Sequence, residues 1–200
     1  MTERHGASAS AFDLGIDHAT YAPRPGAVRR DDLVVFYARA VTARRAVPLG
    51  LLALEDLHRR RPGVELALYG EARPIATRFP HTALGVQTGA QLAELYARAT
   101  VGVVLSMTNP SLVPTEMLAC GLPTVDLASD AMAETFGAGG PVALAPFDPV
   151  ALADAVDGLL ADPGERARRA EAGLALAAQR SWPAAAEQVE AGLRAAVARA

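Results

Sequence analysis

The residues with the clearest chemical potential lie in one stretch, Ser106–Glu116, which reads Ser-Met-Thr-Asn-Pro-Ser-Leu-Val-Pro-Thr-Glu. The stretch follows an apolar run, turns at Asn109-Pro110 and enters a predicted helix with Glu116 in its first turn. Free backbone N–H groups at a helix N-terminus suit an anion such as phosphate. An ordinary helix start, with Ser111 as cap and Glu116 favoured by the helix dipole, explains the same residues equally well.

Three arginines, Arg39, Arg44 and Arg45, follow a second apolar run, Leu33–Tyr37. A guanidinium can bind a diphosphate through paired hydrogen bonds, whereas an isolated loop arginine is usually only solvated. We favour an anion-binding role because the three lie within seven residues after a predicted strand. All 19 basic residues are arginine, so chemistry that needs a lysine is excluded.

Other chemistry has weaker support. The four histidines are scattered without metal-ligand spacing, and we expect no metal and no cofactor. The loop Gly137–Gly140 matches neither a dinucleotide nor a Walker fingerprint. Ser106 and Ser111 lack the Gly-x-Ser-x-Gly pattern of a hydrolase, and Cys120 is expected to be a small buried residue.

Composition limits the class of protein. The chain has 200 residues, of which 51% are hydrophobic, enough for a substantial core. A net charge of −3 argues against nucleic acid as the main partner. No apolar run is long enough to span a bilayer, and residues 1–10 do not resemble a signal peptide. We therefore expect a cytoplasmic protein without a transmembrane segment, or one that is peripheral at the inner face of a membrane.

Apolar runs and helix-like spacings alternate along the chain. Strands are expected at Leu33–Tyr37, Val64–Tyr69, His81–Val86, Val101–Leu105, Thr124–Leu127 and Val142–Leu144. Helices are expected at residues 49–61, with Leu49, Leu52, Ala53 and Leu57 on the apolar face, at 89–99 and 111–120, and in a tail of three that begin near residues 149, 163 and 181. This alternation predicts an α/β fold with a Rossmann-like, doubly wound parallel sheet and a helical C-terminal tail.

The chain divides into three predicted parts. Residues 1–30 form a linker segment, residues 31–180 the Rossmann-like domain and residues 181–200 a closing helix. Ligands of such sheets bind at the carboxyl ends of the strands. That rule brings together the arginine loop, Gly70-Glu71 and the Ser106–Glu116 stretch.

Residues 109–125, NPSLVPTEMLACGLPTV, resemble the donor-site signature of family-4 GT-B glycosyltransferases. That signature combines a Pro-Ser turn, a glutamate in a short helix, and Ala-x-Gly-x-Pro-x-Val. With Tyr37–Arg39 and Thr42–Arg45, the chain looks most like the rhamnosyltransferase branch of surface polysaccharide biosynthesis. Leu14–Asp17 and Ser181-Trp182 resemble the segments that enter and close the C-terminal half of a GT-B fold.

The resemblance implies roles for individual residues. Glu116 would accept hydrogen bonds from the ribose hydroxyls of a nucleotide diphosphate sugar. Arg39 and Arg44 would be catalytic, stabilising the departing diphosphate, and Arg44 or Arg45 would replace a lysine found in many relatives. The remaining implied donor-site residues are Arg45, Asn109, Ser111, Val113, Pro114 and Thr115, the last three at the helix N-terminus, with Gly85 and Val86 beside the base.

The implied activity is metal-independent transfer of a sugar to a glycan acceptor with retention of anomeric configuration, and the branch resemblance suggests rhamnose as the sugar. Thr108 stands where many relatives have a second, sugar-contacting glutamate. The acceptor-binding, N-terminal Rossmann-like domain is expected elsewhere, in a longer chain or a separate one. Two alternatives stay open: a non-catalytic nucleotide-sugar-binding or scaffolding module, and a fragment of a GT-B-like nucleotide-sugar epimerase.

Overall fold

The computed structural model describes residues 9–40 and 42–198. The strands are β1 (Leu33–Tyr37), β2 (Glu65–Tyr69), β3 (Thr82–Gly85), β4 (Val101–Val103), β5 (Thr124–Leu127) and β6 (Val142–Ala145). The helices are the 3₁₀ turn η1 (Ala43–Arg45), α2 (Val47–Arg60), α3 (Gly89–Arg98), α4 (Leu112–Ala119), α5 (Asp130–Phe136), α6 (Pro149–Ala161), α7 (Pro163–Ala178) and α8 (Trp182–Val197). Residues 1–8 of the predicted linker and 199–200 of the predicted closing helix lie outside the described residues.

The six strands form one parallel sheet in the order β3-β2-β1-β4-β5-β6. Strand β1 pairs with β2 on one side and with β4 on the other. The chain therefore builds outward in one direction from β1 to β3 and in the opposite direction from β4 to β6. This is the strand order of a Rossmann-like doubly wound sheet, and the predicted fold class is confirmed.

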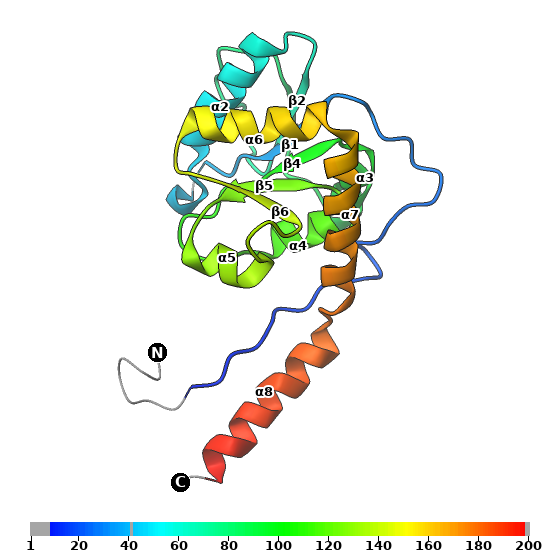
Figure 1. The fold of residues 1–200 in the computed structure, drawn as a ribbon, viewed down its shortest axis with the longest axis vertical. Coiled ribbons are helices and arrows are strands. Elements are labelled where there is room, and N and C mark those ends of the chain that lie inside the picture. Colours follow the sequence, from blue (N-terminus) through cyan, green and yellow to red (C-terminus); the bar gives the residue numbers. More distant parts are fainter. Residues whose placement is uncertain (1–8, 41, 199–200) are drawn as a thin grey trace.

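The sheet is covered on both faces, which explains why its strands appear in the sequence as continuous apolar runs. In β1, Val34 and Phe36 join the core under α2 and α6, whereas Leu33 and Val35 join the core on the opposite face. Figure 1 shows α2 and α6 on one side of the sheet and α4 and α5 on the other. Each predicted strand agrees with the structure to within two residues at either end.

Charged residues join the two helices of the first face. Three consecutive arginines, Arg59–Arg61, lie at the C-terminal end of α2 and its cap. They pair with the nearly buried Asp56 on α2 and with Asp154 and Asp157 on α6. The pairs Arg60–Asp154 and Arg61–Asp157 cross between the helices and hold the C-terminal end of α2 against α6.

Two helix predictions need correction. Leu52 was placed on the apolar face of α2 but is 54% exposed, and Leu54 is buried in its place. The short helix α5 was not predicted, because only Met132 and Phe136 supply buried positions and two positions do not establish a helical period. A serine cap, Ser129, accepts a hydrogen bond from the Met132 N–H and begins this helix.

The last helix, α8, leaves the sheet domain, and the N-terminal segment runs beside it (Figure 1). Ile16 forms a bridge with Ser181, immediately before α8. A Cβ at Gly15 would overlap the Trp182 backbone, so the close approach requires glycine. Within residues 9–40 and 42–198, no helix is both long and apolar enough to cross a bilayer.

We expect Gly50→Ala to lower the free energy of unfolding by about 1–3 kcal/mol, because the new Cβ would overlap the Phe36 ring of β1. Urea denaturation measures this change. Gly158→Ala on α6 is the matched control, because that site is exposed and has nothing within 4 Å. It should raise stability by about 0.5–1 kcal/mol through helix propensity. Similar effects of the two substitutions would contradict this packing.

Candidate functional site

The direction of strand addition reverses between β1 and β4, which are neighbours in the sheet. In open α/β sheets the crevice at the carboxyl ends of such a strand pair is where ligands bind. The loop after β1 contains Arg39, Arg44 and Arg45, and the loop after β4 runs from Val104 to Ser111. The two loops contact each other, because the Met107 N–H donates to the Arg44 carbonyl at 3.1 Å.

Arg45 lies at the centre of this crevice and is only 5% exposed. Its Nη1 donates to the hydroxyl oxygens of Ser106 at 3.3 Å and Ser111 at 3.1 Å. The guanidinium also stacks 5.4 Å from the centroid of the Tyr37 ring. Since a guanidinium carries five N–H groups, donors on Nε and Nη2 stay available after these bonds to described residues.

Arg39 and Arg44 are exposed next to it. The Nη1 of Arg44 donates to Asn109 Oδ1 at 3.3 Å, again joining the two loops. Among the described residues, none of the three arginines forms an ion pair with a carboxylate. The crevice therefore concentrates positive charge that suits an anion with several oxygens, such as a diphosphate.

Glu116 stands in the second turn of α4, not in the first as predicted, because the helix begins at Leu112. Its side chain is half-buried. Burial raises the pKa of the Glu116 carboxyl to about 7, and no hydrogen bond or neighbouring charge offsets that cause. The carboxyl is thus a desolvated acceptor without a compensating partner among the described residues.

The structure adds three details to the expected helix start. Ser111 occupies the N-cap position, but its hydroxyl accepts from Arg45 and makes no capping bond. Pro114 has no N–H and therefore cannot donate to a phosphate. Thr115 is buried, and its hydroxyl accepts a hydrogen bond from Arg180 Nη1 at 3.4 Å, so this hydroxyl is engaged inside the protein.

The remaining predicted residues are more dispersed. Val113 is half-buried against the core of the second face. Gly85 and the 69%-exposed Val86 lie at the carboxyl end of β3, two strands away from β1. The structure thus joins Arg44, Arg45, Asn109 and Ser111 by hydrogen bonds and leaves Gly85 and Val86 near the sheet edge.

Asp126 in β5 was missed by the sequence reasoning. It is completely buried, and its Oδ1 accepts hydrogen bonds from the N–H groups of Ser106 and Leu127, both at 2.7 Å. Burial raises the pKa of Asp126 to about 7. A signal was present, since Asp126 is the one charged residue in the strand Thr124–Leu127 and an unpaired carboxyl is rare in such a place.

All four tyrosines of the chain form a continuous cluster beneath the site. Tyr21 stacks on Tyr96 with ring centroids 6.3 Å apart, and the hydroxyls of Tyr96 and Tyr69 are hydrogen-bonded at 2.8 Å. The Tyr69 ring contacts Tyr37 with centroids 5.3 Å apart, and Tyr37 lies under Arg45. The cluster therefore connects the N-terminal linker to the crevice.

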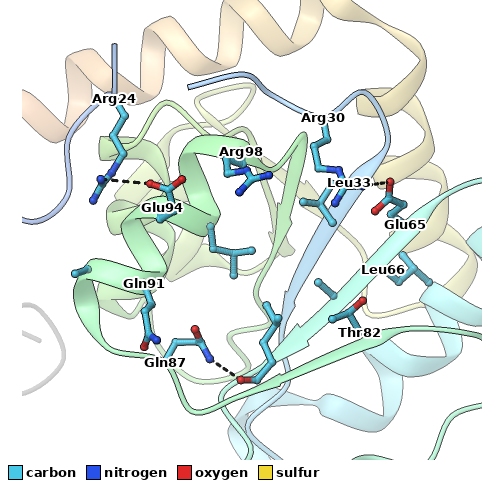
Figure 2. Close-up of a pocket in the computed structure, with 14 residues that line it drawn as sticks. Arg24, Arg30, Leu33, Glu65, Leu66, Thr82, Gln87, Gln91, Glu94 and Arg98 are labelled. Carbon is cyan, nitrogen blue, oxygen red and sulfur yellow. Dashed lines mark hydrogen bonds and ion pairs between the residues drawn. The ribbon is translucent and has the colours of Figure 1, made fainter. Parts of the chain in front are cut away.

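A separate cavity of about 570 Å³ lies between α3 and the amino ends of β1, β2 and β3. Figure 2 shows the two ion pairs at its rim, Arg24 with Glu94 at 3.4 Å and Arg30 with Glu65 at 2.5 Å. None of the predicted site residues lines this cavity. It stands at the opposite end of the strands from the crevice, and we do not include it in the site. Within residues 9–40 and 42–198, no three His, Cys, Asp or Glu side chains gather closely enough to hold a metal ion.

Residues 32–154 match the family described as "WsaF, C-terminal domain". The chain belongs to this family. Its members are GT-B glycosyltransferase domains, so the resemblance to GT-B glycosyltransferases is confirmed.

Two curated relatives agree with this family. The chain is 29% identical to D-inositol 3-phosphate glycosyltransferase from Segniliparus rotundus, over 98% of this chain and 50% of the relative. It is 34% identical over 130 residues to O-antigen biosynthesis protein RfbC from Myxococcus xanthus, covering 60% of this chain and 10% of the relative. The chain thus spans half or less of the length of these relatives.

Solved structures show the same fold. Sucrose-phosphate synthase from Thermosynechococcus elongatus has a TM-score of 0.75 and 24% identity, covering 94% of this chain and 53% of that structure. HepE from Anabaena in complex with UDP has a TM-score of 0.74 and 18% identity, covering 92% and 57%. The C-terminal domain of the group 1 glycosyl transferase LpcC from Francisella tularensis has a TM-score of 0.68 and 15% identity, covering 82% and 97%.

The two desolvated carboxyls should make the protein less stable as the pH rises. Glu116 and Asp126 have pKa values of about 7 when folded and ordinary values of 4.5 and 3.8, so the folded state binds protons more tightly between about pH 4 and pH 7. The destabilisation is absent below that window, grows through it and is constant above it. We expect Tm to fall by roughly 5 °C or more from pH 5 to pH 8.

Glu116→Gln and Asp126→Asn should each reduce this fall, measured as Tm by circular dichroism at both pH values. The exposed Glu187→Gln on α8 serves as the control and should follow the unmodified protein. A fall that is the same in all four proteins would assign the pH dependence to other groups.

Proposed function

We propose that the chain is the donor-binding domain of a glycosyltransferase and that a nucleotide diphosphate sugar binds in the crevice between the β1 and β4 loops. The observation that carries this proposal is the buried Arg45, which has spare donors and no carboxylate partner within the described residues, beside the exposed Arg39 and Arg44. The HepE structures, which hold UDP or UDP-glucose, support a nucleoside diphosphate as the recognised group. Residues 31–180 would form this domain.

The chemistry follows from the charges. Arg39, Arg44 and Arg45 would stabilise the negative charge that develops on the departing diphosphate, which is the task that a metal ion performs in other transferases. Glu116, in its ionised form, would accept hydrogen bonds from the ribose hydroxyls. Of the helix-start residues, Val113 and Thr115 can offer backbone N–H groups to phosphate, and Gly85 and Val86 would border the base.

Substrate and stereochemistry belong to the same proposal. The names of the matching family and of the RfbC relative point toward surface polysaccharide and O-antigen biosynthesis, so we propose a glycan acceptor and a rhamnosyl donor. Retention of the anomeric configuration, the absence of a metal cofactor and a location in the cytoplasm or at the inner face of a membrane complete it.

A second domain is also part of the proposal. Exposed apolar side chains form a stripe along α8 and the adjacent N-terminal segment: Phe12 is 52% exposed, Trp182 48%, Leu193 64% and Val197 77%. Large exposed apolar patches mark interaction surfaces. Because the chain covers only half of the inositol-phosphate enzyme, we propose that a Rossmann-like acceptor domain, in the same polypeptide or a separate one, packs on this stripe and completes the enzyme.

Donor binding is tested by titration calorimetry with UDP-glucose, GDP-mannose and dTDP-rhamnose. We expect saturable binding of at least one of them, and Glu116→Ala should weaken it by about 1–3 kcal/mol because a charge-assisted hydrogen bond is lost. Arg44→Ala and Arg45→Ala should weaken the binding of a nucleoside diphosphate more than the binding of the bare nucleoside.

Arg194→Ala, an exposed arginine on α8, is the control for the loss of one positive charge and should leave both affinities unchanged. No binding of any sugar nucleotide by the unmodified chain would refute the donor-site assignment. Equal losses for diphosphate and nucleoside in the arginine variants would remove these residues from the diphosphate site.

The apolar stripe is tested by sedimentation equilibrium of the isolated chain. Without its second domain the chain should self-associate at tens of micromolar, and Leu193→Asp should reduce that association severalfold because it places a charge in the stripe. Leu52→Asp is a matched control, since Leu52 is also exposed but lies on α2. A strictly monomeric chain, or equal effects of the two substitutions, would argue against the stripe as an interface.

A further inference from the structure

Asp126 is a completely buried carboxyl within the otherwise uncharged strand β5. Its Oδ1 accepts two backbone hydrogen bonds, but its Oδ2 is buried and has no hydrogen-bond partner among the described residues. Burying a half-satisfied carboxyl costs free energy that an apolar residue at the same position would not. A cost of this kind at the edge of a ligand crevice points to a role in the site.

Ser106 connects this carboxyl to Arg45. The Ser106 N–H donates to Asp126 Oδ1 at 2.7 Å, and its hydroxyl oxygen accepts from Arg45 Nη1 at 3.3 Å. Ser106 is 2% exposed, so water does not compete freely for either bond. Asp126 of β5, Ser106 of the β4 loop and Arg45 of the β1 loop therefore form one chain of hydrogen bonds across three neighbouring strands.

The charge of Asp126, like the hydrogen bonds, stabilises the Arg45 guanidinium. The charges of Arg44 and Arg39 disfavour the charged form of Arg45 and lower its pKa, whereas the charge of Asp126 favours that form. Tyr37 on β1 stacks against the guanidinium. Without Asp126, the buried Arg45 guanidinium would keep its hydrogen bonds to the two serine hydroxyls, but the arginines beside it would no longer be opposed by a carboxyl.

We propose that Asp126 is a positioning residue of the donor site, which, through Ser106, holds the Arg45 guanidinium in the crevice. This role rests on the proposed function in one respect, namely that the ligand of Arg45 is the diphosphate of the donor. The contact chain itself is independent of which anion binds. Asp126 acts on the ligand through Arg45 and is not itself a catalytic residue.

The substitutions at Asp126 separate its acceptor from its charge. Asp126→Ala removes the acceptor, which leaves two N–H groups without a partner and releases the start of the β4 loop. Asp126→Asn retains an Oδ1 that can accept both bonds and should therefore rescue the position of Arg45. Ser106→Ala keeps the N–H but removes the hydroxyl that Arg45 contacts, so it should loosen Arg45 even if Asp126→Ala does not fold.

The first measurement needs no ligand. NMR relaxation of the Arg45 Nε–Hε group, assigned by comparison with Arg45→Lys, reports the order of this side chain. The order parameter should be that of a rigid group in the unmodified protein and in Asp126→Asn, and should fall below about 0.6 in Asp126→Ala and Ser106→Ala. An unchanged order parameter in the last two variants would overturn the proposal.

The second measurement is affinity, with inorganic pyrophosphate and UDP-glucose as probes. We expect the affinity of Asp126→Ala to fall at least tenfold for both probes. The affinity of Asp126→Asn should stay within about threefold of that of the unmodified protein. Asp148→Ala is the matched control, because it also removes a carboxylate that accepts a backbone bond, from the Ala151 N–H at 2.8 Å, but at the start of α6. It should lower Tm and leave both affinities unchanged.

The outcomes distinguish failure of the positioning role from failure of the proposed function. If Asp126→Ala lowers Tm as Asp148→Ala does but binds both probes normally, Asp126 is only structural and the proposal fails. If the unmodified protein binds neither probe, the proposed function fails, whereas the Arg45 order parameter still decides whether Asp126 positions the guanidinium. Binding of pyrophosphate without UDP-glucose would reject that particular donor, and the affinity of Asp126→Ala for pyrophosphate would then decide the positioning role.

Discussion

A buried guanidinium that forms no ion pair with a carboxylate of the described residues is the constraint on which the site depends. Removing such a cation from water is unfavourable unless hydrogen bonds and nearby charges replace its hydration. Arg45 obtains that replacement from Ser106, Ser111 and the Tyr37 ring, and the loops after β1 and β4 must adopt the positions that supply these contacts. The crevice is therefore shaped around one side chain before any ligand binds.

The rest of the fold holds that side chain in place. The parallel order of the strands brings β1 and β4 together although 63 residues separate their last and first residues. The ion pairs between α2 and α6 hold the helix that follows Arg45, and the tyrosine cluster supports the ring on which Arg45 stacks. Helices and side chains on both faces of the sheet thus fix the loop after β1, which itself has little regular secondary structure.

Family membership and geometry support each other here. The match over residues 32–154 covers the strands β1 to β6 and the crevice between β1 and β4, whereas α8 and the N-terminal segment lie outside it. These outer parts carry the exposed apolar stripe. The division agrees with the proposal of a donor-binding core that meets a second domain through its terminal segments.

The sequence by itself determined the sheet class and most element ends, because burial on both faces produces apolar runs such as Leu33–Tyr37, and caps such as Asp148 mark helix starts locally. It also identified the two loops that meet in the site. Only the tertiary structure decided which arginine is buried. Arg44 and Arg45 are adjacent and chemically identical, and the difference arises from the turn at Ala46, whose φ is 43°, and from hydroxyls about 60 residues away. The role of Asp126 was equally hidden, since its hydrogen-bond partner Ser106 becomes its neighbour only when β4 and β5 pair.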